Sequence, residues 1–243
     1  IQHHLAKISA YKRFGNFGKI SVDYSLQYNH RREFDVRRGE LSTIPSLDLE
    51  LITNQLNINN LIERANWNWE TGIDLSYQNN YSTPETQARR LVPNYNKYSG
   101  GMYSIFKYNF SPKFNVEAGL RYDLTKYKVK KWYDESDWNN LYAADFSQFY
   151  VKTDGNRVFT EPVLNFENLS FNAGIQWVPS EQFNLKLNYA KVGRSPNIAE
   201  LFADGLHHSA SVLELGNMGL KNEDGNQFNL NIEGKVNVLD GLR

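Results

Sequence analysis

The sequence predicts an all-β fold, an antiparallel transmembrane β-barrel segment of about nine strands that is part of a larger barrel. Three observations predict it. Apolar and polar residues alternate in one segment after another, the joints between these segments are short and long in turn, and aromatic residues make up 14% of the 243 residues. A transmembrane barrel has strands with one apolar and one polar face, short turns at one end and long loops at the other.

The alternation is clearest in residues 114–125. Every second residue from position 114 is apolar or aromatic, and the residues between are Asn, Glu, Gly, Arg, Asp and Thr. Because successive side chains of a strand point to opposite faces, one face of this strand is apolar and the other is polar. The same pattern, or a richness in Leu, Ile, Tyr and Phe, predicts strands at 5–11, 20–28, 47–58, 67–77, 98–110, 114–131, 169–177, 183–189 and 228–236.

The joints between these strands alternate in length. Short joints at 12–18, 111–113 and 179–182 are interleaved with long ones at 31–46, 81–97, 132–165 and 193–225, and the joint at 59–66 is intermediate. Aromatic residues lie beside the short joints, as in the aromatic girdle at the membrane interface of a barrel. They are Phe14, Phe17, Trp67, Phe110, Phe114, Trp177 and Phe183.

A soluble β-sandwich or an antiparallel carbohydrate-binding sheet would also alternate. A strand as long as 114–131 and loops of 16 to 34 residues weigh against these folds, because soluble strands average five or six residues and long loops are uncommon in compact domains. Nine strands do not close a bacterial barrel under the even-number rule, so we expect the chain to be a fragment.

Composition narrows the classes of function. Lys plus Arg equals Asp plus Glu at 27 each, which gives no overall charge to attract nucleic acid. The chain has no cysteine, which excludes disulfides and thiolate metal sites. It has neither an apolar run of the roughly 20 residues that a membrane helix needs nor a recognisable signal peptide.

Three long loops, 81–97, 132–165 and 193–225, contain candidate ligand contacts. His207 and His208 are weak candidates for metal ligands, since adjacent side chains on extended backbone point in opposite directions and a metal needs three or four converging ligands. A polar loop tip is the alternative. Loop 132–165 is rich in aromatic residues, which is typical either of a binding surface or of a self-packed hairpin turning at 153–156. The expected contacts are Tyr81, Tyr95, Trp132, Trp138, Tyr142, His207 and His208.

Residues 187–236 resemble the C-terminal barrel signature of TonB-dependent outer-membrane receptors. The signature is a strand, a phrase R-x-P-N-x-x-E-L-F, and then G-N-x-x-L-K-x-E before the next strand. The matching residues are Arg194, Pro196, Asn197, Glu200, Leu201, Phe202, Gly216, Asn217, Leu220, Lys221 and Glu223. Asn222 departs from the pattern, because many relatives have proline there.

The resemblance implies a 22-stranded barrel in the outer membrane of a Gram-negative bacterium, with an N-terminal plug domain in its lumen. The plug and the remaining strands are not expected in residues 1–243, which form part of the barrel wall. The implied partners are outer-membrane lipid, a metal-complex ligand, and the TonB–ExbB–ExbD complex, which acts through the missing N-terminal part. No resident cofactor and no nucleic-acid partner is expected.

Elementary chemistry suggests structural roles for the signature. Pro196 suits the first turn of a short helix that Ser195 would cap. Glu200 and Glu223 are placed to bond backbone groups where the strands part, with Arg194 as counter-charge.

The function that the resemblance implies is energised uptake of a scarce nutrient, and we expect a metal complex such as a ferric siderophore, haem or zinc. A non-transporting barrel that serves as adhesin or passive pore remains an alternative. A barrel enzyme is a weaker one, because the sequence contains neither an HExxH nor a G-x-S-x-G motif.

Overall fold

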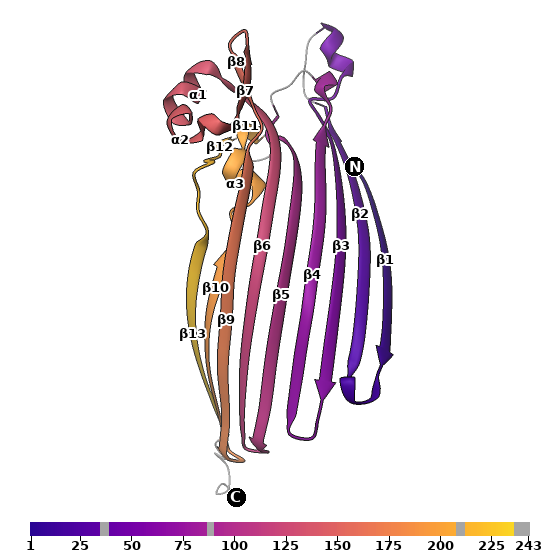
Figure 1. Ribbon diagram of the computed structural model, residues 1–243, viewed down its shortest axis with the longest axis vertical. Coiled ribbons are helices and arrows are strands. Elements are labelled where there is room, and N and C mark those ends of the chain that lie inside the picture. Colours follow the sequence, from indigo (N-terminus) through magenta and orange to yellow (C-terminus); the bar gives the residue numbers. More distant parts are fainter. Residues whose placement is uncertain (35–38, 87–89, 208–211, 236–243) are drawn as a thin grey trace, which may run out of the picture.

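The computed structural model describes residues 1–34, 39–86, 90–207 and 212–235, and consists mainly of one tall, curved antiparallel sheet (Figure 1). Its neighbouring strands follow the order β1-β2-β3-β4-β5-β6-β9-β10-β13, so the nine predicted strands are confirmed. The two edges, β1 and β13, do not meet, and the sheet is therefore an open section of wall. The strands are β1 (Gln2–Arg13), β2 (Lys19–Glu33), β3 (Leu47–Glu63), β4 (Trp67–Ser82), β5 (Asn94–Ser111), β6 (Phe114–Asp134), β9 (Val163–Ser180), β10 (Phe183–Arg194) and β13 (Glu223–Gly234).

The apolar residues of the strands line up across the sheet. Directly paired residues of antiparallel strands share a face. One such row crosses six strands and consists of Val22, Ile58, Ile73, Met102, Tyr122 and Leu169. The exposed fraction of Met102 is 60% and that of Leu169 is 51%. A continuous apolar face this exposed fits contact with the hydrocarbon of a membrane, and we call it the apolar face.

The opposite side, the polar face, carries an ionic cluster near mid-strand. Arg121 donates from Nη1 to Asp74 Oδ2 at 2.6 Å and from Nη2 to Asp123 Oδ1 at 2.7 Å. Gly101 lies beneath this cluster, where a Cβ atom would collide with the side chains of Asp123 and Arg121. The glycine lets the three charged groups lie flat on the sheet.

The short joints gather at one end of the sheet (Figure 1). The joint expected to be intermediate, 59–66, is in fact short, because pairing between β3 and β4 continues to Glu63 and Asn68. Aromatic rings collect at this end as expected: the ring of Phe110 lies 4.7 Å from that of Tyr108 and 5.5 Å from that of Phe114, centroid to centroid.

The long joints gather at the other end and contain structure of their own. Joint 132–165 holds α1 (Glu135–Leu141), α2 (Ala143–Phe146), η4 (Ser147–Phe149) and a hairpin of β7 (Tyr150–Asp154) and β8 (Arg157–Thr160). The hairpin confirms the turn expected at 153–156, where Gly155 has a φ of 57°. Joint 193–225 holds α3 (Ile198–Phe202), β11 (Asp204–His207) and β12 (Val212–Leu215).

Shorter helical turns fill the remaining joints. They are η1 (Gly15–Phe17), η2 (Gly39–Thr43) and η3 (Pro84–Thr86). Within the described residues, no helix is long and apolar enough to cross a membrane.

The two faces make a first prediction. Leu120→Arg places a cation on the apolar face of β6, where Leu120 is 54% exposed. Near the membrane midplane this should cost about 2–4 kcal/mol of folding free energy. Guanidinium titration of the full-length protein in phospholipid vesicles measures this loss. Glu117→Arg adds the same side chain to the polar face of the same strand, and an equal loss in both variants contradicts the assignment of the faces.

Candidate functional site

The candidate site is the loop module, which comprises α1, α2, η4, the β7–β8 hairpin, α3 and the β11–β12 hairpin. Its core includes Tyr95 of β5 and Tyr127 and Val129 of β6. These side chains share the polar face of the sheet with Arg121 and lie nearer the long-joint end. Figure 1 shows the module standing at the long-joint end of β6 and β9. Its geometry starts from α3, because the signature residues lie around that helix.

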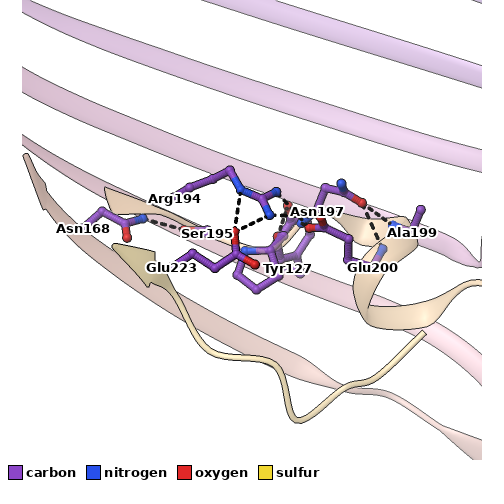
Figure 2. A network of polar contacts seen from close by, with 9 residues as sticks. Tyr127, Asn168, Arg194, Ser195, Asn197, Ala199, Glu200 and Glu223 are labelled. Carbon is purple, nitrogen blue, oxygen red and sulfur yellow. Dashed lines mark hydrogen bonds and ion pairs between the residues drawn. The ribbon is translucent and has the colours of Figure 1, made fainter. Parts of the chain in front are cut away.

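A capping box starts α3 (Figure 2). Asn197 Oδ1 accepts hydrogen bonds from the backbone N–H groups of Ala199 at 2.9 Å and Glu200 at 3.0 Å, and the Asn197 N–H donates to Glu200 Oε2 at 2.7 Å. These bonds satisfy N–H groups that the first turn of a helix otherwise leaves unpaired.

The prediction that Ser195 caps the helix with Pro196 in its first turn was therefore wrong. Asn197 has extended backbone angles, φ −83° and ψ 169°, so it is the last non-helical residue and Pro196 precedes the cap. Ser195 Oγ instead accepts from Asn168 Nδ2 of β9 at 2.7 Å. The Pro196 carbonyl accepts from the Tyr127 hydroxyl of β6 at 3.2 Å, which ties the approach to the helix to the sheet.

Arg194 clamps three elements together. Its Nη1 and Nη2 each donate to one oxygen of Glu200 at 3.0 Å, and Nη2 also donates to Glu223 Oε2 at 2.7 Å. The end of β10, the first turn of α3 and the start of β13 are thereby joined (Figure 2). The predicted counter-charge role of Arg194 and backbone contact of Glu200 are confirmed, whereas Glu223 meets the Arg194 side chain. The bonds from Arg194 and the Asn197 N–H lower the pKa of Glu200 below its ordinary 4.5.

The Gly216-Asn217 pair closes the other end of α3. The Gly216 N–H donates to Ala203 O at 2.7 Å and the Asn217 N–H to Glu200 O at 2.8 Å, which satisfies carbonyls at the helix C-terminus. A Cβ on Gly216 would lie only 2.6 Å from Ala203 N, so the position requires glycine. Asn217 Oδ1 then accepts from the Gly219 N–H at 2.8 Å and turns the chain.

The rest of the signature lies on the surface between this turn and β13. Leu220 and Lys221 are exposed, and the Leu220 N–H donates to Asn217 O at 3.2 Å. Asn222 donates from Nδ2 to Glu167 O of β9 at 2.6 Å. This hydrogen bond tethers the segment before β13 to the sheet.

The apolar side of α3 fills the centre of the loop module. Leu201 and Phe202 are 0% and 1% exposed and share a core with Met218 at 2%. The other buried members are Tyr95, Tyr127, Val129, Tyr133, Trp138 and Val158. This core holds α1, α3 and the ends of β5 and β6 in one packed unit.

A buried ion pair lies beside this core. Lys131 Nζ donates to Asp204 Oδ2 at 2.8 Å and to Phe202 O at 3.3 Å, and the two charged side chains are 6% and 10% exposed. Sequence reasoning missed this pair. The available signal was alternation, since Lys131 shares its strand face with Tyr127, Val129 and Tyr133 and therefore points into the core.

The structure brings three of the expected ligand contacts together and separates the others. Tyr95 and Trp138 are buried in the core at 6% and 4% exposure. Tyr142 is half-buried, its hydroxyl donates to Gly216 O at 3.2 Å, and burial raises its pKa. Tyr81, 47% exposed, and half-buried Trp132 belong to the apolar-face register, and the Trp132 ring lies 4.3 Å from the Arg157 guanidinium.

The histidine pair contributes no described side-chain geometry. His207 ends β11, and its pairing with Val212 is a backbone feature. His208 lies outside the described residues. Among the residues that are described, no group of three or more His, Cys, Asp or Glu side chains is arranged to hold a metal ion.

Several cavities open on the polar side of the described residues, and two of them are relevant to the candidate site. One of about 150 Å³ lies between α1 and β12, and its lining includes Asp137, Tyr142 and Leu215. Another of about 570 Å³ lies lower on the sheet, where its lining includes Glu70, Tyr103 and Arg121. Both can take polar ligand atoms, since each offers carboxylate, hydroxyl or cationic groups beside an apolar wall.

A two-faced antiparallel sheet with a folded loop module at one end defines a section of membrane-spanning barrel wall. Residues 3–242 match the family model for the TonB dependent receptor-like β-barrel, and the chain belongs to that family. A search of curated proteins finds no match. The family and the similar structures are receptors and transporters, not enzymes.

Solved structures share the fold at low sequence identity. The copper transporter OprC has a TM-score of 0.66 and 13% identity over 97% of this chain and 36% of its own. The FrpB iron transporter of Neisseria meningitidis, F5-1 variant apoprotein, gives 0.60 and 14% over 97% and 35%. The Serratia marcescens hemophore receptor HasR, as a double mutant with HasA and heme, gives 0.61 and 14% over 95% and 36%. The chain spans about a third of the length of these proteins.

The strap over α3 makes a second prediction. Gly216→Ala should force Gly216-Asn217 away from the helix, because overpacking typically costs about 1–3 kcal/mol. Limited proteolysis of the full-length receptor should then cut segment 195–222 about tenfold faster, since cleavage follows the population of the opened loop. Gly225→Ala is the control, because its Cβ would meet only Val192 O at 3.9 Å. Equal cleavage of both variants contradicts the role of the strap.

The Arg194 clamp makes a third prediction, on pH. Because the folded-state pKa of Glu200 is below 4.5, its contribution to loop stability is present above that pH and is lost as the pH falls through the folded value. Protease protection of segment 195–222 should weaken on acidification. In Glu200→Gln, protection should be lower at neutral pH and depend less on acid. Glu135→Gln, an exposed change on α1, should keep the wild-type profile, and an unaltered profile in Glu200→Gln sinks this assignment.

Proposed function

We propose that the chain is part of the wall of an outer-membrane receptor that takes up a scarce nutrient, a metal complex such as a ferric siderophore or haem, or zinc. In this proposal an N-terminal plug domain and further strands complete the barrel. The TonB–ExbB–ExbD complex energises uptake through the N-terminal part. The outer membrane of a Gram-negative bacterium is the proposed location.

The observation that carries the proposal is the arrangement of the loop module above a polar inner wall. The module packs on the same face as the Arg121 cluster, so a ligand held at the module would lie above a charged passage rather than above lipid. The family membership supports energised uptake. The copper, iron and heme proteins among the similar structures support a metal-containing nutrient.

The module of this chain supplies one wall of the proposed site. The cavity beside Tyr142 holds about 150 Å³, less than the roughly 300–1,000 Å³ of ordinary ligand pockets. Tyr142 and Asp137 are among its lining residues and are the contacts proposed for a ligand there. Tyr95 and Trp138 act by holding the wall rigid, because both are buried in the core.

The remaining expected contacts do not line this cavity. Tyr81 and Trp132 would meet a ligand only at the outer rim, given their places on the apolar-face register. His207 and His208 stay candidates for direct contact with a metal complex.

A fourth prediction tests the function. Cells producing the full-length receptor should accumulate one labelled species from a panel of ferric siderophores, haem, zinc, copper and an oligosaccharide, and only when TonB is active. Uptake without TonB would indicate a passive pore, and surface binding without uptake an adhesin. Uptake of the oligosaccharide alone would remove the metal assignment.

Binding of the same labelled species to cells that produce receptor variants tests which residues contact the ligand. Tyr142→Ala should weaken ligand binding by about tenfold, because interface aromatic residues often contribute more than 1 kcal/mol. Tyr150→Ala is the control, since Tyr150 is 49% exposed on the β7–β8 hairpin. His207→Ala with His208→Ala reports on the histidine pair. Equal binding by the Tyr142 and Tyr150 variants contradicts the placement of the site.

A further inference from the structure

Three lysines stand on the apolar face of β6 just beyond its apolar residues. Lys126, Lys128 and Lys130 follow Leu124 at every second position, and all three are exposed. Residues spaced by two share a strand face, so the lysines continue the row that Leu124 ends. Their Cα atoms cover about 13 Å of strand at the long-joint end.

Neighbouring strands surround these lysines with tyrosine and amide groups. On β5, Tyr98 pairs with Lys126, Asn96 with Lys128 and Asn94 with Lys130. The Lys128 ammonium lies 5.8 Å from the centre of the Tyr98 ring. Tyrosines at the edge of an apolar band are typical of the membrane interface, so the lysines begin at headgroup depth.

The same surface is hollowed. A cavity of about 400 Å³ opens among the ends of β4, β5, β6 and β9. Its lining residues include Asn94, Asn96, Lys128, Lys130 and Glu161. The two ammonium groups are donors for phosphate oxygens. The amide oxygens of Asn94 and Asn96 accept from the Ser82 N–H and from the Tyr77 and Asn79 side chains, so these two asparagines offer their amide N–H groups to sugar hydroxyls.

The acidic groups on this surface are too few and too weakly paired to neutralise the three lysines. Glu161 Oε1 lies 3.8 Å from Lys130 Nζ, but the two side chains are 60% and 78% exposed, and such exposed pairs are weak. Glu167 accepts a hydrogen bond from the Tyr122 hydroxyl at 2.7 Å, one row nearer the apolar residues. Three lysines therefore face two carboxylates, one of which is engaged by a tyrosine.

We propose that this basic surface binds the phosphorylated sugar headgroup of a glycolipid in the outer leaflet. The lysines bind the phosphates, the asparagines bind sugar hydroxyls, and Leu124 with its apolar neighbours contacts the acyl chains. Continuity of the basic surface with the apolar face favours a lipid over a soluble anion, because one molecule then covers both. The proposal rests on the outer-membrane setting of the proposed function and is independent of the transported nutrient.

The test is a binding titration of the full-length receptor, purified and delipidated in neutral detergent, with bis-phosphorylated lipid A. The variant carries Lys126→Gln, Lys128→Gln and Lys130→Gln. Each basic residue near an anionic lipid surface contributes about fivefold, so the variant should bind on the order of a hundredfold more weakly. Wild-type binding should weaken with salt and with lipid A stripped of its phosphates.

A matched control distinguishes binding at this surface from a general effect of removing three positive charges. Lys12→Gln, Lys19→Gln and Lys113→Gln remove the same charge at the short-turn end and should leave binding unchanged. Equal binding by the two triple variants, or equal binding of phosphorylated and dephosphorylated lipid, overturns the proposal. Inorganic phosphate that binds as tightly as the lipid also overturns it, because the acyl chains then contribute nothing.

Nutrient binding measured on the same preparations keeps the two proposals apart. If the lysine variant binds lipid as the wild type does while both bind the nutrient, the lipid surface is disproved and the nutrient proposal stands. A receptor that is absent from the outer membrane removes the setting on which both depend.

Discussion

The structure depends on one constraint: a chain that crosses hydrocarbon must satisfy its backbone N–H and C=O groups by pairing strands. The registers show pairing along the length of the strands, fifteen residue pairs between β2 and β3 alone. Continuous pairing fixes which side chains share a face, and so produces the apolar and polar faces together. Irregular backbone is then confined to the two ends, where the short turns and the loop module lie.

The loop module provides hydrogen-bond partners for the backbone groups that are left unpaired where β10 and β13 separate. Beyond Arg194 and Glu223, β10 and β13 no longer pair, and their next backbone groups need partners. The capping box, the Arg194 clamp and the Gly216-Asn217 strap supply these partners around a helix of only five residues. A helix this short is not stable alone, so its stability comes from Leu201 and Phe202 in the core. The residues at which the sheet ends thus also hold the loop module together.

Much of the sheet was predictable from sequence because its faces follow a period of two. Strand ends were not: β9 begins at Val163 rather than near 169, because the polar residues Asn165 and Glu167 continue the ladder where the face has left hydrocarbon. The cap was misassigned to Ser195, since serine and asparagine both cap helices and only backbone angles choose between them. The aromatic loop was understood in part. Its hairpin follows from a turn motif, but the burial of Trp138 depends on α3, which lies about sixty residues later in the sequence.

The segment from Lys126 to Lys131 shows how the paired strand sorts chemistry that the sequence mixes. As letters, KYKVKK is one basic run broken by an aromatic and an aliphatic residue. As strand, it sends Lys126, Lys128 and Lys130 to the apolar-face register, while Tyr127, Val129 and Lys131 enter the core. Lys131 is tolerated there because Asp204 and the Phe202 carbonyl surround its ammonium, whereas an unpaired buried charge would be strongly unfavourable. One short run therefore ties the loop module to the inner wall and places a basic surface on the outer one.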